Sequence, residues 1–194
     1  KNTNWRGRWS LMAAVVYEFN PVERFVAGTV GVPGERTFFI QARTGSRIVS
    51  VVVDKSQVIA LGERTKIMLR EIKKSDPAII IKSNVVDDAP LEQPIFEEFR
   101  AGVIAMAWDA ENSVIVYELR EITSGEESTD DVAVFDEEDL SSDLLRVHVS
   151  PEQASAFSKR CLTLANAGRT PCPFCAIPID PNGHLCPRAN GYRR

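Results

Sequence analysis

The sequence predicts an α+β fold built from two successive β-β-β-α units, with antiparallel sheets, helices on one face and an irregular C-terminal tail. The first observation is a short repeat, because the pattern E-x-F-x-A-G occurs at residues 23–28 and again at 97–102. The second is that each copy opens a series of β-like stretches that ends in a helical pattern. The third is a proline-rich end, in which cysteine and histidine replace the apolar periodicity of the body.

Three strands are expected in each unit, because short runs rich in β-branched and aromatic residues are separated by turn formers. The first two strands of each unit are joined by residues 32–35 and 109–112, which contain glycine, proline, aspartate and asparagine. The predicted strands are residues 25–32, 37–42 and 47–53 in the first unit, and 101–108, 113–120 and 144–149 in the second.

A helix is expected directly after each third strand. Asp54 and Gln57 form one capping box, and Ser150 and Gln153 form the other, with Pro151 at the first helical position. The apolar stripes of the two helices then match at a constant offset of 96 residues. The paired positions are Val58, Leu61, Thr65, Met68 and Leu69 against Ala154, Phe157, Cys161, Leu164 and Ala165. A duplicated body explains this order, and the alternative is that the β-β-β-α order recurs by coincidence.

The predicted organisation has five parts. Residues 1–15 are an N-terminal extension, 16–74 the first unit and 75–96 a linker with three prolines. Residues 97–168 form the second unit, which contains an acidic loop at 123–143, and residues 169–194 form the tail. The acidic loop accounts for the greater length of the second unit, since it separates the second strand from the third.

Composition indicates a soluble, cytoplasmic globular protein. No apolar run approaches the length of a membrane span, and no signal-peptide pattern follows the basic N-terminus. Four cysteines in such a chain are not expected to form disulfides. The net charge of −4 is uneven, because residues 126–143 carry nine acidic residues and no basic one, whereas the C-terminal end is basic.

Three cysteines and one histidine of the tail have the spacing of a metal site. Cys172, Cys175, His184 and Cys186 follow the pattern C-x2-C-x8-H-x-C, and Cys3His is a common ligand set of structural zinc. Zinc is therefore the expected cofactor, bound as the tail folds. Iron or redox chemistry at the C-x-x-C pair is the competing interpretation, and a tail without metal is the third.

Catalytic signals are scarce, so the sequence favours a protein that is not an enzyme. Four protein ligands leave zinc no open position for a catalytic water, and the usual nucleophile and phosphate-loop motifs are absent from the sequence. His148 is the remaining histidine, and strand alternation predicts it on the solvated face. Cys161 is expected in the buried stripe of the second helix rather than at the metal.

The leading functional hypothesis is a non-enzymatic interaction or regulatory protein with an unidentified protein partner. The tail would present Arg188, Tyr192, Arg193 and Arg194 to that partner. A nucleic-acid-binding tail is the alternative, since arginine can meet phosphates and tyrosine can stack on a base. A further alternative is an enzyme or ligand-binding protein that takes a phosphorylated substrate in the groove between the repeats.

The sequence also resembles an uncharacterised family of actinobacterial proteins, a domain of unknown function. The resemblance lies in E-F-N-P-V-E-R-F-V-A-G-T-V-G at residues 18–31 and its continuation at 33–42. It includes C-P-F-C at 172–175 and H-L-C-P-R-A-N-G-Y-R-R at 184–194, with Ala176 where the family usually has glycine. Members are typically encoded beside phosphoglycerate-mutase-like and phosphatidylinositol-kinase-like proteins. The resemblance thus implies an actinobacterial cytoplasmic protein with phosphate-handling partners, and it implies no catalytic residue.

Overall fold

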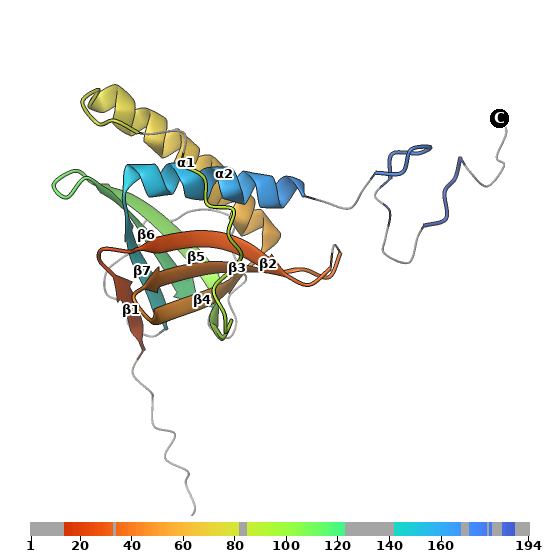
Figure 1. The fold of residues 1–194 in the computed structure, drawn as a ribbon, viewed down its shortest axis with the longest axis horizontal. Helices are drawn as coiled ribbons and strands as arrows, with labels where there is room; N and C mark the ends of the chain where they lie inside the picture. Colours follow the sequence, from red (N-terminus) through yellow and green to blue (C-terminus); the bar gives the residue numbers. More distant parts are fainter. Residues whose placement is uncertain are drawn as a thin grey trace, which may run out of the picture.

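The computed structural model shows one mixed seven-stranded sheet with two helices packed on one of its faces (Figure 1). It describes residues 14–32, 34–81, 85–122, 142–167, 171–177, 179 and 184–188. The elements are β1 (Val16–Phe19), β2 (Arg24–Val30), β3 (Thr37–Thr44), β4 (Arg47–Val53), α1 (Lys55–Ser75), β5 (Glu97–Asp109), β6 (Val114–Glu121), β7 (Leu144–Val149) and α2 (Pro151–Asn166). The α+β class is therefore confirmed.

The expectation of antiparallel sheets is wrong, because the strands form a single mixed sheet in the order β1-β7-β6-β5-β4-β3-β2. β4 and β5 pair in parallel at its centre, and α1 supplies the crossover that a parallel pair requires. β1, which the sequence analysis missed, adds in parallel to β7 at one edge. The six expected strands correspond to β2–β7, and the largest difference is at β5, which begins four residues early at Glu97.

The sheet is strongly curled around its aromatic core. Phe25 of β2 and Tyr117 of β6 have ring centroids 5.0 Å apart. Four strand spacings separate β2 from β6 in the sheet order, so a flat sheet would hold them about 19 Å apart. Phe157 of α2 stacks on Phe25 at 4.4 Å and closes the cluster from the helical side. The curl therefore brings the two halves of the sheet and α2 into one hydrophobic core.

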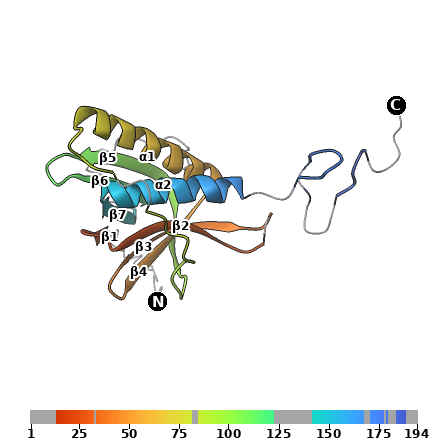
Figure 2. The same ribbon diagram turned by 45° about the horizontal axis from the view of Figure 1, so that its top comes forward.

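Both helices begin at the expected capping boxes and cross closely. The N–H of Asp54 donates to Gln57 Oε1 at 2.9 Å, and that of Ser150 donates to Gln153 Oε1 at 3.3 Å. At the crossing, Ser158 Oγ donates to the carbonyl of Gly62 at 2.6 Å. A Cβ at Gly62 would lie 2.9 Å from the Cβ of Cys161, so glycine sets this close approach. Figures 1 and 2 show both helices above the same face of the sheet.

The metal-ligand arm (residues 171–188) lies outside this core, whereas the linker packs Ile79 and Ile81 against it and buries Leu91 in a second apolar cluster. The described part of the arm lies beyond the C-terminal end of α2 and away from the sheet in both views (Figures 1 and 2). The acidic loop expected at 123–143 falls almost entirely outside the described residues. Within the described chain, neither helix has the length and apolar character needed to cross a membrane.

Candidate functional site

The structure brings together the four residues that the sequence nominated as metal ligands. One ligand atom from each of Cys172, Cys175, His184 and Cys186 lies within 4.8 Å of the other three. The Sγ atoms of Cys172 and Cys186 are 3.7 Å apart, and Cys175 Sγ is 3.2 Å from His184 Nε2. All four cysteines of the chain are free thiols. The sulfur pair is far beyond the disulfide bond length of about 2.0 Å.

These distances fit tetrahedral coordination. With zinc–sulfur bonds of about 2.3 Å, two sulfur atoms at tetrahedral corners lie about 3.8 Å apart. The Cys172–Cys186 separation of 3.7 Å matches that edge. Both of these cysteines are buried within the arm, whereas Cys175 and His184 are partly exposed. The described donor set can therefore hold a metal ion with all four of its corners filled by protein.

The first ligand pair sits on a turn closed by the backbone. The N–H of Ala176 donates to the carbonyl of Cys172 at 2.8 Å, and the N–H of Cys172 donates to the carbonyl of Ile177 at 2.9 Å. Ala176 has φ of 61°, in the left-handed region that glycine adopts without strain. The resemblance implies glycine at this position, and glycine would adopt this φ without the strain that Ala176 carries.

The same turn supplies hydrogen-bond donors to sulfur. Burial by itself raises the pKa of Cys172, but donation from the backbone N–H groups of Cys175 and Phe174 outweighs it and lowers the net pKa. Burial raises the pKa of Cys175, which lies beside the other thiols. The turn thus favours the thiolate form at Cys172, and thiolate is the form that binds metal.

Arg188 ties the two halves of the arm together. Its Nη1 donates to the carbonyl of Phe174 at 3.0 Å. This hydrogen bond links the segment that follows His184 and Cys186 to the turn that carries Cys172 and Cys175. Tyr192, Arg193 and Arg194, the other predicted partner-binding residues, lie outside the described residues. Cys161 lies in the core between the helices, away from the metal ligands, and burial raises the pKa of its thiol.

Sequence reasoning missed the exposed apolar side chains of the arm. Phe174 is 61% exposed, Ile177 48% and Leu185 87%. Each is separated from a metal ligand by at most one residue along the chain. The sequence does contain a sign of them, because each apolar residue lies between or beside metal ligands, in a segment too short to form a core that could bury it.

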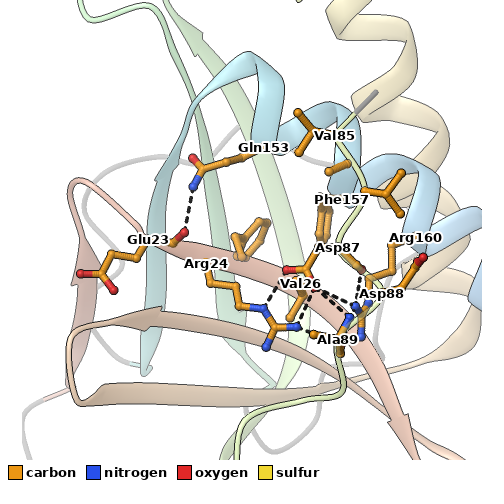
Figure 3. Close-up of a pocket in the computed structure, with 13 residues that line it drawn as sticks. Glu23, Arg24, Val26, Val85, Asp87, Asp88, Ala89, Gln153, Phe157 and Arg160 are labelled. Carbon is orange, nitrogen blue, oxygen red and sulfur yellow. Dashed lines mark hydrogen bonds and ion pairs between the residues drawn. The ribbon is translucent and has the colours of Figure 1, made fainter. Parts of the chain in front are cut away.

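A second candidate site is a groove between β2, α2 and the linker segment (residues 85–92). It encloses about 410 Å³, and Figure 3 shows Arg24, Asp87 and Arg160 meeting in it. Arg24 donates to both carboxylate oxygens of Asp87, at 2.7 and 2.8 Å. Arg160 donates to Asp87 Oδ1 at 3.3 Å and to the carbonyl of Ala89 at 2.8 Å.

The two arginines fasten the linker segment across this groove. Arg24 also donates to the carbonyls of Ala89 and Pro90 and to Glu92 Oε1, at 2.9, 3.0 and 3.1 Å. Its hydrogen bond to Asp87 raises the pKa of Arg24, whereas burial lowers that of Arg160. The donors of Arg24 are thus committed to the protein itself, and the groove is primarily a structural clamp.

His148 occupies the outer face of β7, as the strand alternation predicted. Its Nε2 lies 3.2 Å from Glu18 Oε1 on the neighbouring β1. His148 lines neither the groove beside the linker segment nor the groove between α1 and α2. The described structure therefore gives this histidine a role in pairing β1 with β7.

The comparisons with known proteins agree with the sequence resemblance. The profile of a family described as protein of unknown function (DUF3090) matches residues 17–186. The chain belongs to this family. The DUF3090 match ends at Cys186, so it includes the whole ligand set. No curated protein and no solved structure matches the chain. The family is thus confirmed, whereas the actinobacterial origin and the neighbouring genes stay predictions.

Proposed function

We propose that this DUF3090 protein is a non-enzymatic interaction protein whose C-terminal arm is folded by structural zinc. The observation that carries the proposal is the closed set of four ligand atoms within 4.8 Å of one another. Zinc favours tetrahedral sulfur and nitrogen ligands, and a site filled by protein leaves no position for a catalytic water. Zinc binding then provides the folding free energy that the arm cannot obtain from a hydrophobic core.

The exposed apolar side chains support a protein partner. An arm of this size cannot bury Phe174, Ile177 and Leu185 itself, and they remain 48–87% exposed. Apolar side chains gathered around a rigid centre are typical of contact surfaces. Arg188, Tyr192, Arg193 and Arg194 stay predicted contributors to the contact surface. A cytoplasmic location also stays a prediction.

The first experiment tests the metal. Substitution Cys175→Ser should reduce bound zinc from one per chain to near zero, measured by elemental analysis of the purified protein. Cys161→Ala is the matched control, since this buried cysteine lies outside the ligand set. Equal zinc in the Cys175→Ser variant and the native protein, or iron in its place, would exclude this assignment.

The second experiment tests the interaction. Any protein that co-purifies at fixed stoichiometry should be lost from a Phe174→Ala, Leu185→Ala double variant that still holds its zinc. Both side chains are more than 60% exposed, so their removal should leave folding unchanged. Retention of that protein by the double variant would contradict a contact surface on the arm.

We also infer that the body arose by duplication. Gly62 and Ser158, which are equivalent at the offset of 96 residues, meet at the helix crossing through a 2.6 Å hydrogen bond. The two capping glutamines each reach the other unit, Gln57 to the carbonyl of Gly102 at 3.1 Å and Gln153 to that of Glu23 at 3.1 Å. The contact between the equivalent positions Gly62 and Ser158, and the two glutamines that occupy the same place in both capping boxes, support a repeat.

The alternative functions have weaker support. Nucleic-acid binding would need the basic tail, and Arg188 donates a hydrogen bond within the arm. Binding of RNA by the purified protein with an affinity that falls steeply as salt is added would favour this alternative. A phosphorylated ligand in the linker groove would have to displace Asp87 from Arg24 and Arg160. Protection of the linker segment from proteolysis by inorganic phosphate would favour that alternative.

A further inference from the structure

A second groove lies between α1 and α2, apart from both the metal centre and the linker segment. It encloses about 410 Å³ and has an apolar floor formed by Leu69 of α1, Leu162 of α2 and Ile81. Leu69 is buried, and the other two are half-buried. The remaining lining residues are polar or basic: Lys66, Arg70, Lys73, Ser155, Ser158 and Lys159. The groove therefore combines an apolar base with hydrophilic rims.

The charge on the rims is of one sign. Lys66, Arg70 and Lys73 occupy one edge of α1 and are all exposed, and Lys159 lies on the α2 side. No acidic side chain lines the groove among the described residues. Within that part of the chain, neither Lys66 nor Lys73 is in an ion pair with a carboxylate. The described lining of this groove is therefore positively charged, although the net charge of the chain is −4.

The spacing of the cations indicates what the groove fits. Lys66, Arg70 and Lys73 are four and three residues apart, which places them about 6 and 4.5 Å apart along the helix axis. Acidic residues on a helix at i, i+4 and i+7 have the same spacing. A helix that lies between α1 and α2 would pack its apolar face on the floor formed by Leu69 and Leu162.

We propose that the groove between α1 and α2 is a docking site for an amphipathic acidic helix of a partner protein. The apolar floor contacts the apolar face of that helix, and the basic side chains on the α1 rim form ion pairs with the acidic residues along its edge. Nucleic acid fits less well, because the lining residues include no aromatic side chain on which a base could stack. An amphipathic acidic helix can bury its apolar side chains on the floor and pair its carboxylates with the basic rim at the same time.

The test uses a synthetic peptide of about 18 residues, long enough for partial helix formation. Its leucines form one face and its glutamates flank them at i, i+4 and i+7. A control peptide has the same composition, with the glutamates moved to the face opposite the rim. Binding to the full chain is measured by fluorescence anisotropy at low salt, where exposed charges are least screened.

The matched variants keep the fold and change only the rim. Lys66→Glu and Lys73→Glu together should weaken peptide binding at least about tenfold, since two attractive pairs become repulsive while the net charge changes as much as in the control below. Lys55→Glu with Lys74→Glu is the control, because both are exposed on α1 outside the groove. Leu162→Ala tests the floor and should also weaken binding. Unchanged far-ultraviolet circular dichroism is required of every variant.

Several results would overturn the proposal. Equal affinity of the two peptides, or of the rim and control variants, would show that only net charge matters. Binding of a single-stranded RNA, but not of the peptide, through the three rim cations would assign the groove to nucleic acid. Peptide binding only after deletion of residues 126–139 would show that the acidic segment of the chain itself occupies the groove. Selective, rim-dependent binding of the first peptide by the full chain is the supporting result.

Discussion

Substitution Arg24→Ala should destabilise the protein more than any other single change at an ion pair described above. The Arg24 side chain is 11% exposed and makes five hydrogen bonds to the linker segment, two of them to Asp87 at 2.7 and 2.8 Å. Hydrogen bonds to charged groups contribute about 1.5–3 kcal/mol each, but water recovers part of the loss because Asp87 is 28% exposed. We therefore expect a loss of about 2–4 kcal/mol in the free energy of unfolding.

The assay is urea unfolding of Arg24→Ala, Asp87→Ala and the double variant. The two single losses should not add, and the coupling free energy should be about 1–3 kcal/mol. Arg100→Ala is the matched control, because Arg100 pairs with Asp54 at 3.1 Å but both side chains are more than 40% exposed. That control should cost less than about 1 kcal/mol. A coupling near zero, or equal losses for Arg24→Ala and Arg100→Ala, would refute the clamp.

The same pair should make stability depend on pH. Hydrogen bonding from Arg24 lowers the pKa of Asp87, outweighing the opposite effect of burial. Because the pKa of Asp87 is lower in the folded state than in the unfolded state, the pair stabilises the protein fully at pH values above the unfolded aspartate pKa of about 3.9. It is lost as the pH falls through the folded pKa. The urea midpoint should fall more between pH 6 and pH 3 in the native protein than in Asp87→Asn, and parallel pH profiles would contradict this assignment.

Three further substitutions test local features of the fold. Ala176→Gly should raise the stability of the metal-loaded arm by about 0.5–1 kcal/mol, because glycine removes the strain at φ 61°; lower resistance to chelator would contradict it. Tyr117→Phe should cost about 1–2 kcal/mol in urea unfolding, since it breaks a buried 2.9 Å hydrogen bond with Thr65; an additive loss with Thr65→Val would argue against that bond. Gly28→Ala should cost about 1–3 kcal/mol, because its Cβ would lie 2.4 Å from Leu91 Cγ; Leu91→Ala should then reduce the penalty, and no reduction would exclude the clash.

The local elements could be predicted because their signals are local. The capping boxes at Asp54 and Ser150 fixed the beginnings of both helices, and the alternation of β7 placed His148 on the outer face. The ligand set was predictable for the same reason, since its spacing along the chain already restricts its geometry. β1 was missed because four residues carry too little periodicity, and it forms only by pairing with β7.

The order of strands and the grooves depend on contacts between distant segments. The parallel pair β4–β5 results from the crossover through α1, and the pattern within a strand does not say which other strand becomes its neighbour. Arg24 and Asp87 are separated by 63 residues, and only the folded chain shows that they meet. The spacing of Lys66, Arg70 and Lys73 is visible in the sequence, but by itself it indicates only a solvated helix face. The groove is apparent only in the folded chain, where α2 packs beside α1.

The linker segment and the metal-ligand arm are ordered by the same physical principle. Each buries little apolar surface to offset the conformational entropy that ordering removes, and in the linker segment Leu91 is the one buried side chain. The linker segment is therefore also held by the guanidinium groups of Arg24 and Arg160, and the arm by four ligand atoms that converge on one point. Segments held by polar contacts or ligand atoms keep apolar side chains exposed, as Val86 at 65% and Leu185 at 87% illustrate. Segments of this kind are positioned without being covered, which is the property that a contact surface for another protein requires.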